Sequence, residues 1–187
     1  SILSFTAAKL WPRRRNGKNT FSATVAQGIN VGSWNTTPRS PVPLPPWWLS
    51  LAHYEWAELA VDVMDVTPPA HDPQGDMMLS SVCLNPARVD VVSPWPVHRI
   101  GPDWQPRQTE PTFLVVFRDA QLDVQFAEIN AVTAHVLSLL DQGLSGQQAV
   151  AQLATDMKHP DPQALQGFGQ QLLISLREQG VLLGTKI

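Results

Sequence analysis

The stretch that decides the fold runs from residue 112 to residue 140 and reads TFLVVFRDAQLDVQFAEINAVTAHVLSLL. It opens with a continuous apolar run, Phe113–Arg118, which is rich in Val and Phe and predicts a strand covered on both faces. A polar turn over 119–121 follows. Leu122–Ile129 then alternates between apolar and polar side chains, which predicts a half-buried strand. The region therefore begins with a β-hairpin.

Three helices and a short strand are predicted after the hairpin. The helix start signals are an N-cap, a capping box, and an N-cap before a first-turn proline. Asn130 is the N-cap of a helix over 131–142, and Ser145 with Gln148 forms the capping box of the second helix. Asp161 before Pro162 opens the third helix, which runs to Gln179. Gly143 and Gly180 are natural stops, and Val181–Leu183 is a short strand candidate. The predicted inward side chains are Val132, Val136, Leu139, Leu140, Val150, Leu153, Met157, Leu165, Phe168, Leu172 and Leu176.

Upstream, a proline-rich lead-in precedes one more helix, predicted over residues 47–64. Its apolar face follows helical spacing and consists of Leu49, Ala52, Trp56, Leu59 and Val63. An acidic stripe lies beside that face and is the predicted partner-binding surface: Glu55, Glu58, Asp62 and Asp65. Residues 67–111 are rich in loops, with short extended pieces at 88–92 and 96–100 that prolines confine to sheet edges or irregular paths.

Charge divides the chain into unlike parts. The 187 residues carry a net charge of −3, yet residues 1–40 hold six basic residues and no acidic one. The rest holds 13 − 6 = 7 basic and 16 acidic residues, a net charge of −9. We expect three parts: a basic tail at 1–40, a helix with a proline-rich connection at 41–111, and a module at 112–187. Three interpretations of the basic tail remain open: a mobile, solvated segment, a patch that binds nucleic acid or a membrane surface, or a stretch that is not native family sequence.

No motif supports an enzyme or a metal site. Phosphate loops, dinucleotide fingerprints and nucleophile elbows are absent. His53 points away from Glu55 on a helix, His98 has no sequence-evident catalytic partner, and Cys83 has no cation beside it that would lower its pKa. The sequence predicts no catalytic residue, no metal and no cofactor. Without a signal peptide or an apolar run long enough for a membrane span, we expect a cytoplasmic protein with no membrane partner.

The second and third C-terminal helices suggest a helix-turn-helix in a winged-helix frame, which leaves two functions open. A DNA-binding regulator needs clustered Lys and Arg, but residues 112–187 carry four basic and seven acidic residues, so nucleic acid is disfavoured. Peptide capture instead needs a sheet edge, and the strand 122–129 offers one unless residues 90–100 cover it. A metal-dependent enzyme is the weakest alternative.

Four segments resemble HvfC-type proteins: LAHYEWAELA at 51–60, WPVHRIGP at 95–102, PTFLVVFR at 111–118 and EINAVTA at 128–134. The resemblance runs from about Pro45 to Thr185. It implies a non-enzymatic accessory protein of a multinuclear non-haem iron oxidase. The pair would modify cysteines of a ribosomally made precursor peptide to give copper-binding products, a role similar to that of the accessory protein in methanobactin synthesis.

The resemblance also implies an α+β module of the PqqD type, a small antiparallel sheet with three helices, whose third strand and third helix hold the peptide. The peptide-binding residues it implies are Leu122, Asp123, Val124, Gln125, Phe126, Ala127, Glu128, Leu165, Phe168, Gly169 and Leu172. The family's helical N-terminal domain should precede Pro45, and residues 1–40 do not match it. The resemblance therefore predicts a truncated or altered N-terminus.

Overall fold

The computed structural model describes residues 9–11, 43–159, 161 and 163–187. Within them the helices are α2 (Trp48–Asp62), η1 (a 3₁₀ turn, Val97–Arg99), α3 (Ala131–Asp141), α4 (Gly146–Asp156) and α5 (Ala164–Glu178). The strands are β1 (Lys9–Trp11), β2 (His71–Asp72), β3 (Val82–Leu84), β4 (Arg88–Ser93), β5 (Thr112–Arg118), β6 (Val124–Ile129) and β7 (Leu182–Lys186). The fold is α+β, as predicted; most of the predicted tail and Pro162 lie outside the described residues.

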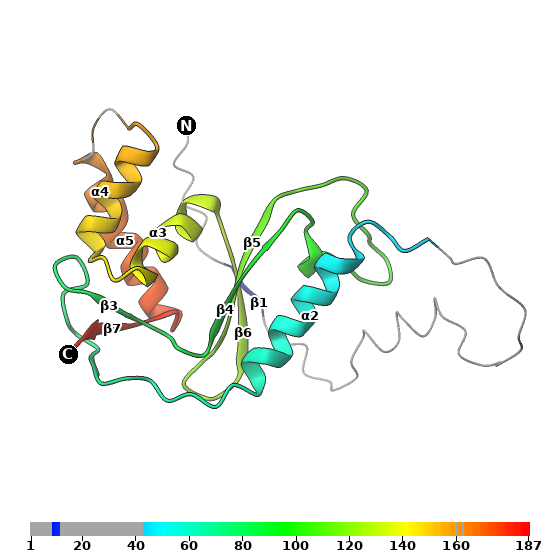
Figure 1. Ribbon diagram of the computed structural model, residues 1–187, viewed down its shortest axis with the longest axis horizontal. Coiled ribbons are helices and arrows are strands. Elements are labelled where there is room, and N and C mark those ends of the chain that lie inside the picture. Colours follow the sequence, from blue (N-terminus) through cyan, green and yellow to red (C-terminus); the bar gives the residue numbers. More distant parts are fainter. Residues whose placement is uncertain (1–8, 12–42, 160, 162) are drawn as a thin grey trace, which may run out of the picture.

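The main sheet is antiparallel, with strand order β1-β6-β5-β4, and it has a hydrophobic core on each face. Val115 and Phe117 of β5 pack with the helices α3, α4 and α5, whereas Leu114 and Val116 pack with α2. Figure 1 shows the helical group α3–α5 and the helix α2 on opposite sides of the strands. The continuous apolar run is therefore a central strand covered on both faces, as predicted.

A second sheet, with strand order β2-β7-β3, holds the C-terminal strand, which the sequence placed only as a short strand candidate. The side chain of Asn85, which follows β3, ties this sheet to the main one. Its amide nitrogen donates to the carbonyls of Arg118 and Gly180 at 2.9 Å each, and its amide oxygen accepts from the Ala87 N–H at 2.9 Å. The side chain thus satisfies three backbone groups at the junction of the two sheets.

The predicted caps of α3 and α4 are confirmed. The Asn130 side chain accepts from the N–H of Thr133, and Ser145 with Gln148 forms a complete capping box. Gly143 follows α3 with a φ of +90°, a conformation that glycine adopts without strain. The side chain of Asp161 accepts from the N–H groups of residues 163 and 164, so α5 begins at Ala164, later than predicted.

Three local predictions are wrong. Residues 97–99 form a 3₁₀ turn in place of an extended piece, because the N–H groups of Arg99 and Ile100 bond back to residues 96 and 97. Met157 is 45% exposed because it caps the end of α4 and does not face inward. On α2, the buried side chains are Leu51, Ala57 and Val61, so the apolar face that the spacing defined points away from the sheet.

Candidate functional site

The candidate site is the outer edge of β6, and in this structure that edge carries an added strand. One edge of β6 pairs with β5, and the other pairs antiparallel with β1, a segment of the chain more than a hundred residues upstream. Leu10 lies opposite Ala127 in the register, with Trp11 opposite Phe126 and Lys9 opposite Glu128. The sequence left open that residues 90–100 cover this edge, but β4 within that segment pairs with β5.

The N-terminal end of β6 differs from the prediction, because Leu122 and Asp123 belong to the preceding turn. The Asp119 carboxylate accepts from the N–H groups of Gln121 and Asp123, at 2.9 Å each. Leu122 takes a φ of +67° and is 69% exposed. The turn is therefore longer than predicted, and pairing through β6 begins at Val124.

The side chains of β6 face both cores, so the strand is more buried than its alternation predicted. Val124 and Phe126 pack with α2, where Tyr54 lies against the Phe126 ring at a centroid distance of 5.2 Å. Ala127 and Ile129 pack with α3–α5. Gln125 and Glu128 are partly exposed. With most side chains of β6 engaged, its backbone edge is the part that can recognise an extended segment.

An ionic cluster holds the C-terminal end of β6. One carboxylate oxygen of Glu128 lies 3.3 Å from Nε2 of His98, and the other lies 3.1 Å from the guanidinium of Arg99. Arg99 also reaches Glu110 at 3.3 Å. The His98 side chain is 8% exposed, and its Nδ1 has no hydrogen-bond partner among the described residues. The cluster fixes the 3₁₀ turn η1 beside β6.

Stability at mildly acidic pH should depend on His98. Burial lowers the pKa of His98, more than Glu128 raises it, and Arg99 lowers it further. The folded state therefore binds this proton more weakly than the unfolded chain, so we expect stability to be complete above pH 6.5 and to fall as the pH drops through that value. Urea denaturation at pH 7.5, 6.5 and 5.5 measures this loss. His98→Gln should flatten it while His53→Gln, at an exposed site, should not; equal slopes for all three proteins would contradict the assignment.

The residues predicted on α5 separate into two groups. Phe168 and Leu172 pack into the core that also contains Ala127 and Ile129 of β6. Leu165 is buried with Val150 and Ala154 of α4, and a Cβ on Gly169 would clash with the Val150 side chain. Those two residues hold α5 against α4. Phe168, which is only partly buried, is the predicted α5 residue that has both solvent exposure and a place in the β6 core.

The predicted acidic stripe lies on and just beyond α2. Asp62 and Asp65 are exposed, whereas Glu55 and Glu58 are partly buried. Burial raises the pKa of Glu55, and the neighbouring Glu58 raises it further. Burial also raises the pKa of the Tyr54 hydroxyl, with both glutamates adding to the effect. The stripe is therefore a region of concentrated negative potential on the face of the helix.

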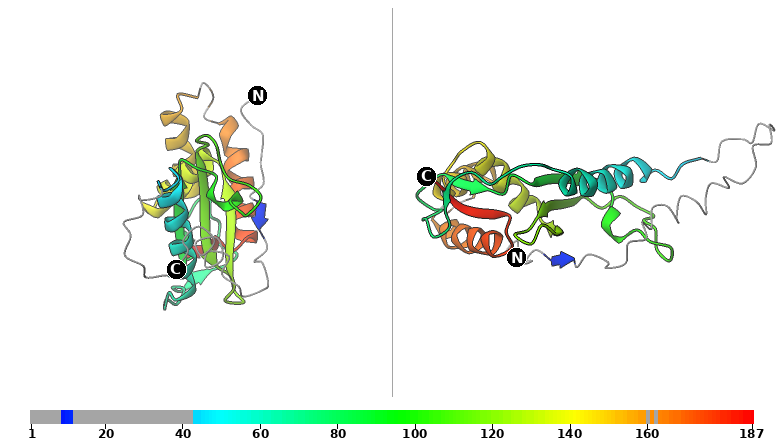
Figure 2. Two further views of the ribbon diagram at one scale, coloured as in Figure 1. Left: turned by 90° about the vertical axis from the view of Figure 1, so that its right-hand side faces the viewer. Right: turned by 90° about the horizontal axis from the view of Figure 1, so that it is seen from below.

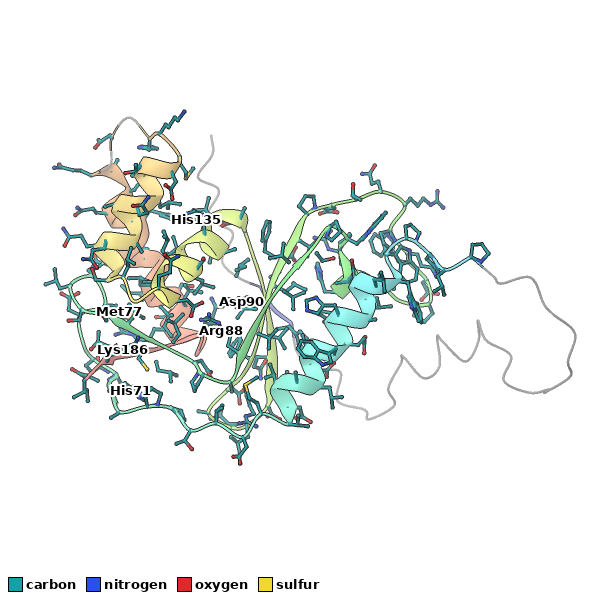
Figure 3. The ribbon with its side chains drawn as sticks, viewed as in Figure 1. His71, Met77, Arg88, Asp90, His135 and Lys186 are labelled. Atoms are coloured by element: carbon teal, nitrogen blue, oxygen red, sulfur yellow. The ribbon has the colours of Figure 1, made fainter. Side chains whose placement is uncertain are left out.

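Several other ionisable groups form ion pairs or are buried. Arg88 pairs with Asp90 at 3.0 Å (Figure 3) and also contacts Asp141, so it ties β4 to α3. The imidazole of His135 lies 2.9 Å from the carboxylate of Asp156. Burial raises the pKa of the Cys83 thiol, and Lys186 opposes it only in part. In the described part of the chain, no three His, Cys, Asp or Glu side chains are placed to hold a metal ion. No helix in the same part is long and apolar enough to cross a bilayer.

Two features of the site were missed by sequence reasoning. Lys9–Trp11 is too short to give a periodic signal, and nothing in its sequence points to β6 as its partner. His98 has no partner that the sequence reveals, because Glu128, which pairs with it, lies 30 residues away along the chain. The motif that surrounds His98, WPVHR, is the sequence feature that could have indicated a site there.

The comparison with protein families places the site within a known domain. Residues 88–177 match the HvfC C-terminal domain. A search of the curated proteins found no match to the chain. The matched segment begins at β4, includes β5, β6, α3 and α4, and ends within α5. It also contains three of the four segments on which the resemblance rested. The chain therefore carries a segment that matches the HvfC C-terminal domain, which supports an HvfC-type identity.

Proposed function

We propose that this protein is a non-catalytic accessory protein that binds a ribosomally synthesised precursor peptide on the edge of β6. It presents the peptide to a multinuclear iron-dependent oxidase that modifies the peptide's cysteines. The match to the HvfC C-terminal domain supports a role in this kind of peptide maturation. The protein acts in the cytoplasm, and its own contribution is positioning, which raises the effective concentration of the peptide at the oxidase.

The observation that carries the proposal is the pairing of β1 with β6. A segment from elsewhere in the chain adds to this edge as an antiparallel strand, so the edge has the geometry that an extended peptide needs. β1 has only three residues, and a longer peptide strand would form more backbone hydrogen bonds with the six-residue strand β6. The precursor would therefore replace β1 on the edge.

The surroundings of β6 also suit peptide binding. Three strands, β4, β5 and β6, precede three helices, α3, α4 and α5, which is the arrangement that the PqqD-type resemblance implies. Phe168 on α5, partly exposed beside the core of β6, supplies an apolar surface for a peptide side chain. Glu128 contributes a carboxylate at one end of the strand, next to the backbone on which the peptide would add.

Charge argues for a peptide partner over DNA. The matched module carries few cations, and Arg177 on α5, the helix that would read DNA, donates to the carbonyl of Pro73 at 3.3 Å. A helix with a single arginine cannot neutralise several phosphates. The acidic stripe Glu55, Glu58, Asp62 and Asp65 is the proposed contact with the oxidase, whose facing surface would be basic.

We expect a short Cys-rich peptide and an iron oxidase to be encoded beside this protein, and the decisive test uses both. We expect all three to co-purify, and the peptide to bind the accessory protein alone. A synthetic leader should lose at least tenfold in affinity when alternate backbone amides are N-methylated, because those amides donate to the edge of β6. N-methylation of the intervening amides, which point to solvent, is the matched control. Equal losses from both sets would contradict strand addition, and salt-sensitive retention of the protein on DNA would favour a regulator.

A further inference from the structure

The helix α2 carries a second apolar face that nothing in the described chain covers. Four large apolar side chains on the helix and its C-cap point to solvent: Leu49 is 80% exposed, Trp56 56%, Leu59 59% and, at the C-cap, Val63 69%. The sheet takes the opposite face of the helix, through Leu51, Ala57 and Val61. A continuous exposed patch of this kind on a helix marks a site of protein association more often than a scattered leucine does.

The spacing of this face is that of a helix–helix seam. Leu49, Ala52, Trp56, Leu59 and Val63 follow one another at alternating intervals of three and four residues. This is the a/d pattern of packed helices, in which apolar side chains repeat every 3.5 residues on average. We call these five residues the α2 seam. The 15-residue helix is about 22 Å long at 1.5 Å per residue, long enough to hold a partner helix of four turns.

The largest side chain of the α2 seam is already partly ordered. His53 stacks on Trp56, with ring centroids 5.8 Å apart and an interplanar angle of 17°. A tryptophan held in this way loses less conformational entropy when a partner packs on it. Exposed Trp residues near the centre of an apolar patch are also the side chains that contribute most to binding free energy.

Charge beside the α2 seam identifies the kind of helix that fits it. Glu55 and Asp62 immediately precede Trp56 and Val63, which places both carboxylates along one flank of the seam. The other flank has His53 and Ala60 and carries no carboxylate. The raised pKa of Glu55 shows that its environment disfavours negative charge, which a nearby cation would relieve. An antiparallel second copy would bring the acidic flanks together, which like-charge repulsion disfavours.

We infer that the α2 seam docks a helix of a partner protein, one whose own apolar seam is flanked by Lys or Arg on the side that faces Glu55 and Asp62. This surface is separate from the peptide edge. α2 lies on one face of the sheet, against Val124 and Phe126, whereas a peptide adds to the backbone edge of β6 (Figure 2). A helix and a peptide can therefore bind at the same time.

The test uses the full chain and a synthetic 21-residue helix with Leu at its a and d positions and Lys along one flank. Titration calorimetry should detect one helix per chain. Leu59→Asp should weaken binding at least tenfold, since it places a carboxylate in the middle of the α2 seam. Leu79→Asp is the matched control, because Leu79 is 70% exposed and lies outside α2, and it should bind the helix as wild type does.

A probe with Glu in place of each Lys tests the charge, and we expect its binding to be at least tenfold weaker at low salt. Equal binding of the two probes would overturn the charge assignment. Absence of binding, or equal binding by Leu59→Asp and wild type, would overturn the inference. A wild-type dimer that Leu59→Asp dissociates, seen by sedimentation equilibrium, would overturn it in favour of self-association. Precursor binding to Leu59→Asp is measured in parallel and should be unchanged, so failure of the seam and failure of the peptide edge are told apart.

Discussion

A chain carrying Leu10→Pro should bind the precursor peptide about tenfold more tightly than the wild-type chain does. Leu10 lies opposite Ala127 in the β1–β6 register, and proline both removes a backbone donor and fixes φ near −65°, so β1 can no longer pair. β1 is tethered to its site, and a tethered segment acts at an effective concentration on the order of millimolar. Freeing the edge raises the fraction of the protein that can bind the peptide, and the apparent Kd falls by the same factor.

Leu10→Val is the control for this change, because valine retains the N–H and suits a strand. It should bind the labelled precursor peptide as wild type does, in a fluorescence anisotropy titration. An affinity for Leu10→Pro equal to that of wild type would mean that β1 does not compete for the edge. A lower affinity would mean that β1 supports the peptide site.

The substitution Asn85→Ala should destabilise the fold by about 3 kcal/mol, since it leaves three backbone groups without a partner in a buried or partly buried environment. The carbonyls of Arg118 and Gly180 lose their donor, and the N–H of Ala87 loses its acceptor. Asn85 is only 8% exposed, so water replaces these bonds poorly. Urea denaturation at pH 7.5 measures the change in the free energy of unfolding.

Asn130→Ala is the comparison for Asn85→Ala. Asn130 also bonds to the backbone, but it is an exposed N-cap that satisfies the single N–H of Thr133, and loss of such a cap costs about 1 kcal/mol. Equal destabilisation by the two substitutions would show that the junction at Asn85 is no more important than an ordinary cap.

Much of the main sheet and its helices could be predicted, because local signals coincide there with tertiary structure. The apolar run of β5 is the central strand, and the caps Asn130 and Ser145 open the helices that they were expected to open. The turn before β6 is two residues longer than predicted, because the Asp119 carboxylate accepts from the N–H of Asp123, a residue that the alternation places in the strand.

The orientation of α2 could not be predicted from its sequence, for a physical reason. The helix has apolar side chains on two faces, and periodicity identifies an apolar face without saying what covers it. The more regular face, with Leu49 and Trp56, is exposed, while the face with Ala57 and Val61 meets the sheet because small side chains allow close approach. The pairing of β1 with β6 was beyond prediction for a different reason, since it joins segments that share no local signal.

The second sheet has a practical consequence for anyone who would produce the HvfC domain by itself. The matched segment stops short of β3 on one side and of β7 on the other, yet these two strands pair with each other and so fasten both ends of the domain. Met77, Val82 and Leu182, all outside 88–177, are buried in the core of α3–α5. A fragment cut at the family boundaries would leave that core open to water, and it would also lack α2, which covers the core on the other face of the main sheet. The shortest piece expected to fold therefore runs from α2 to the end of β7.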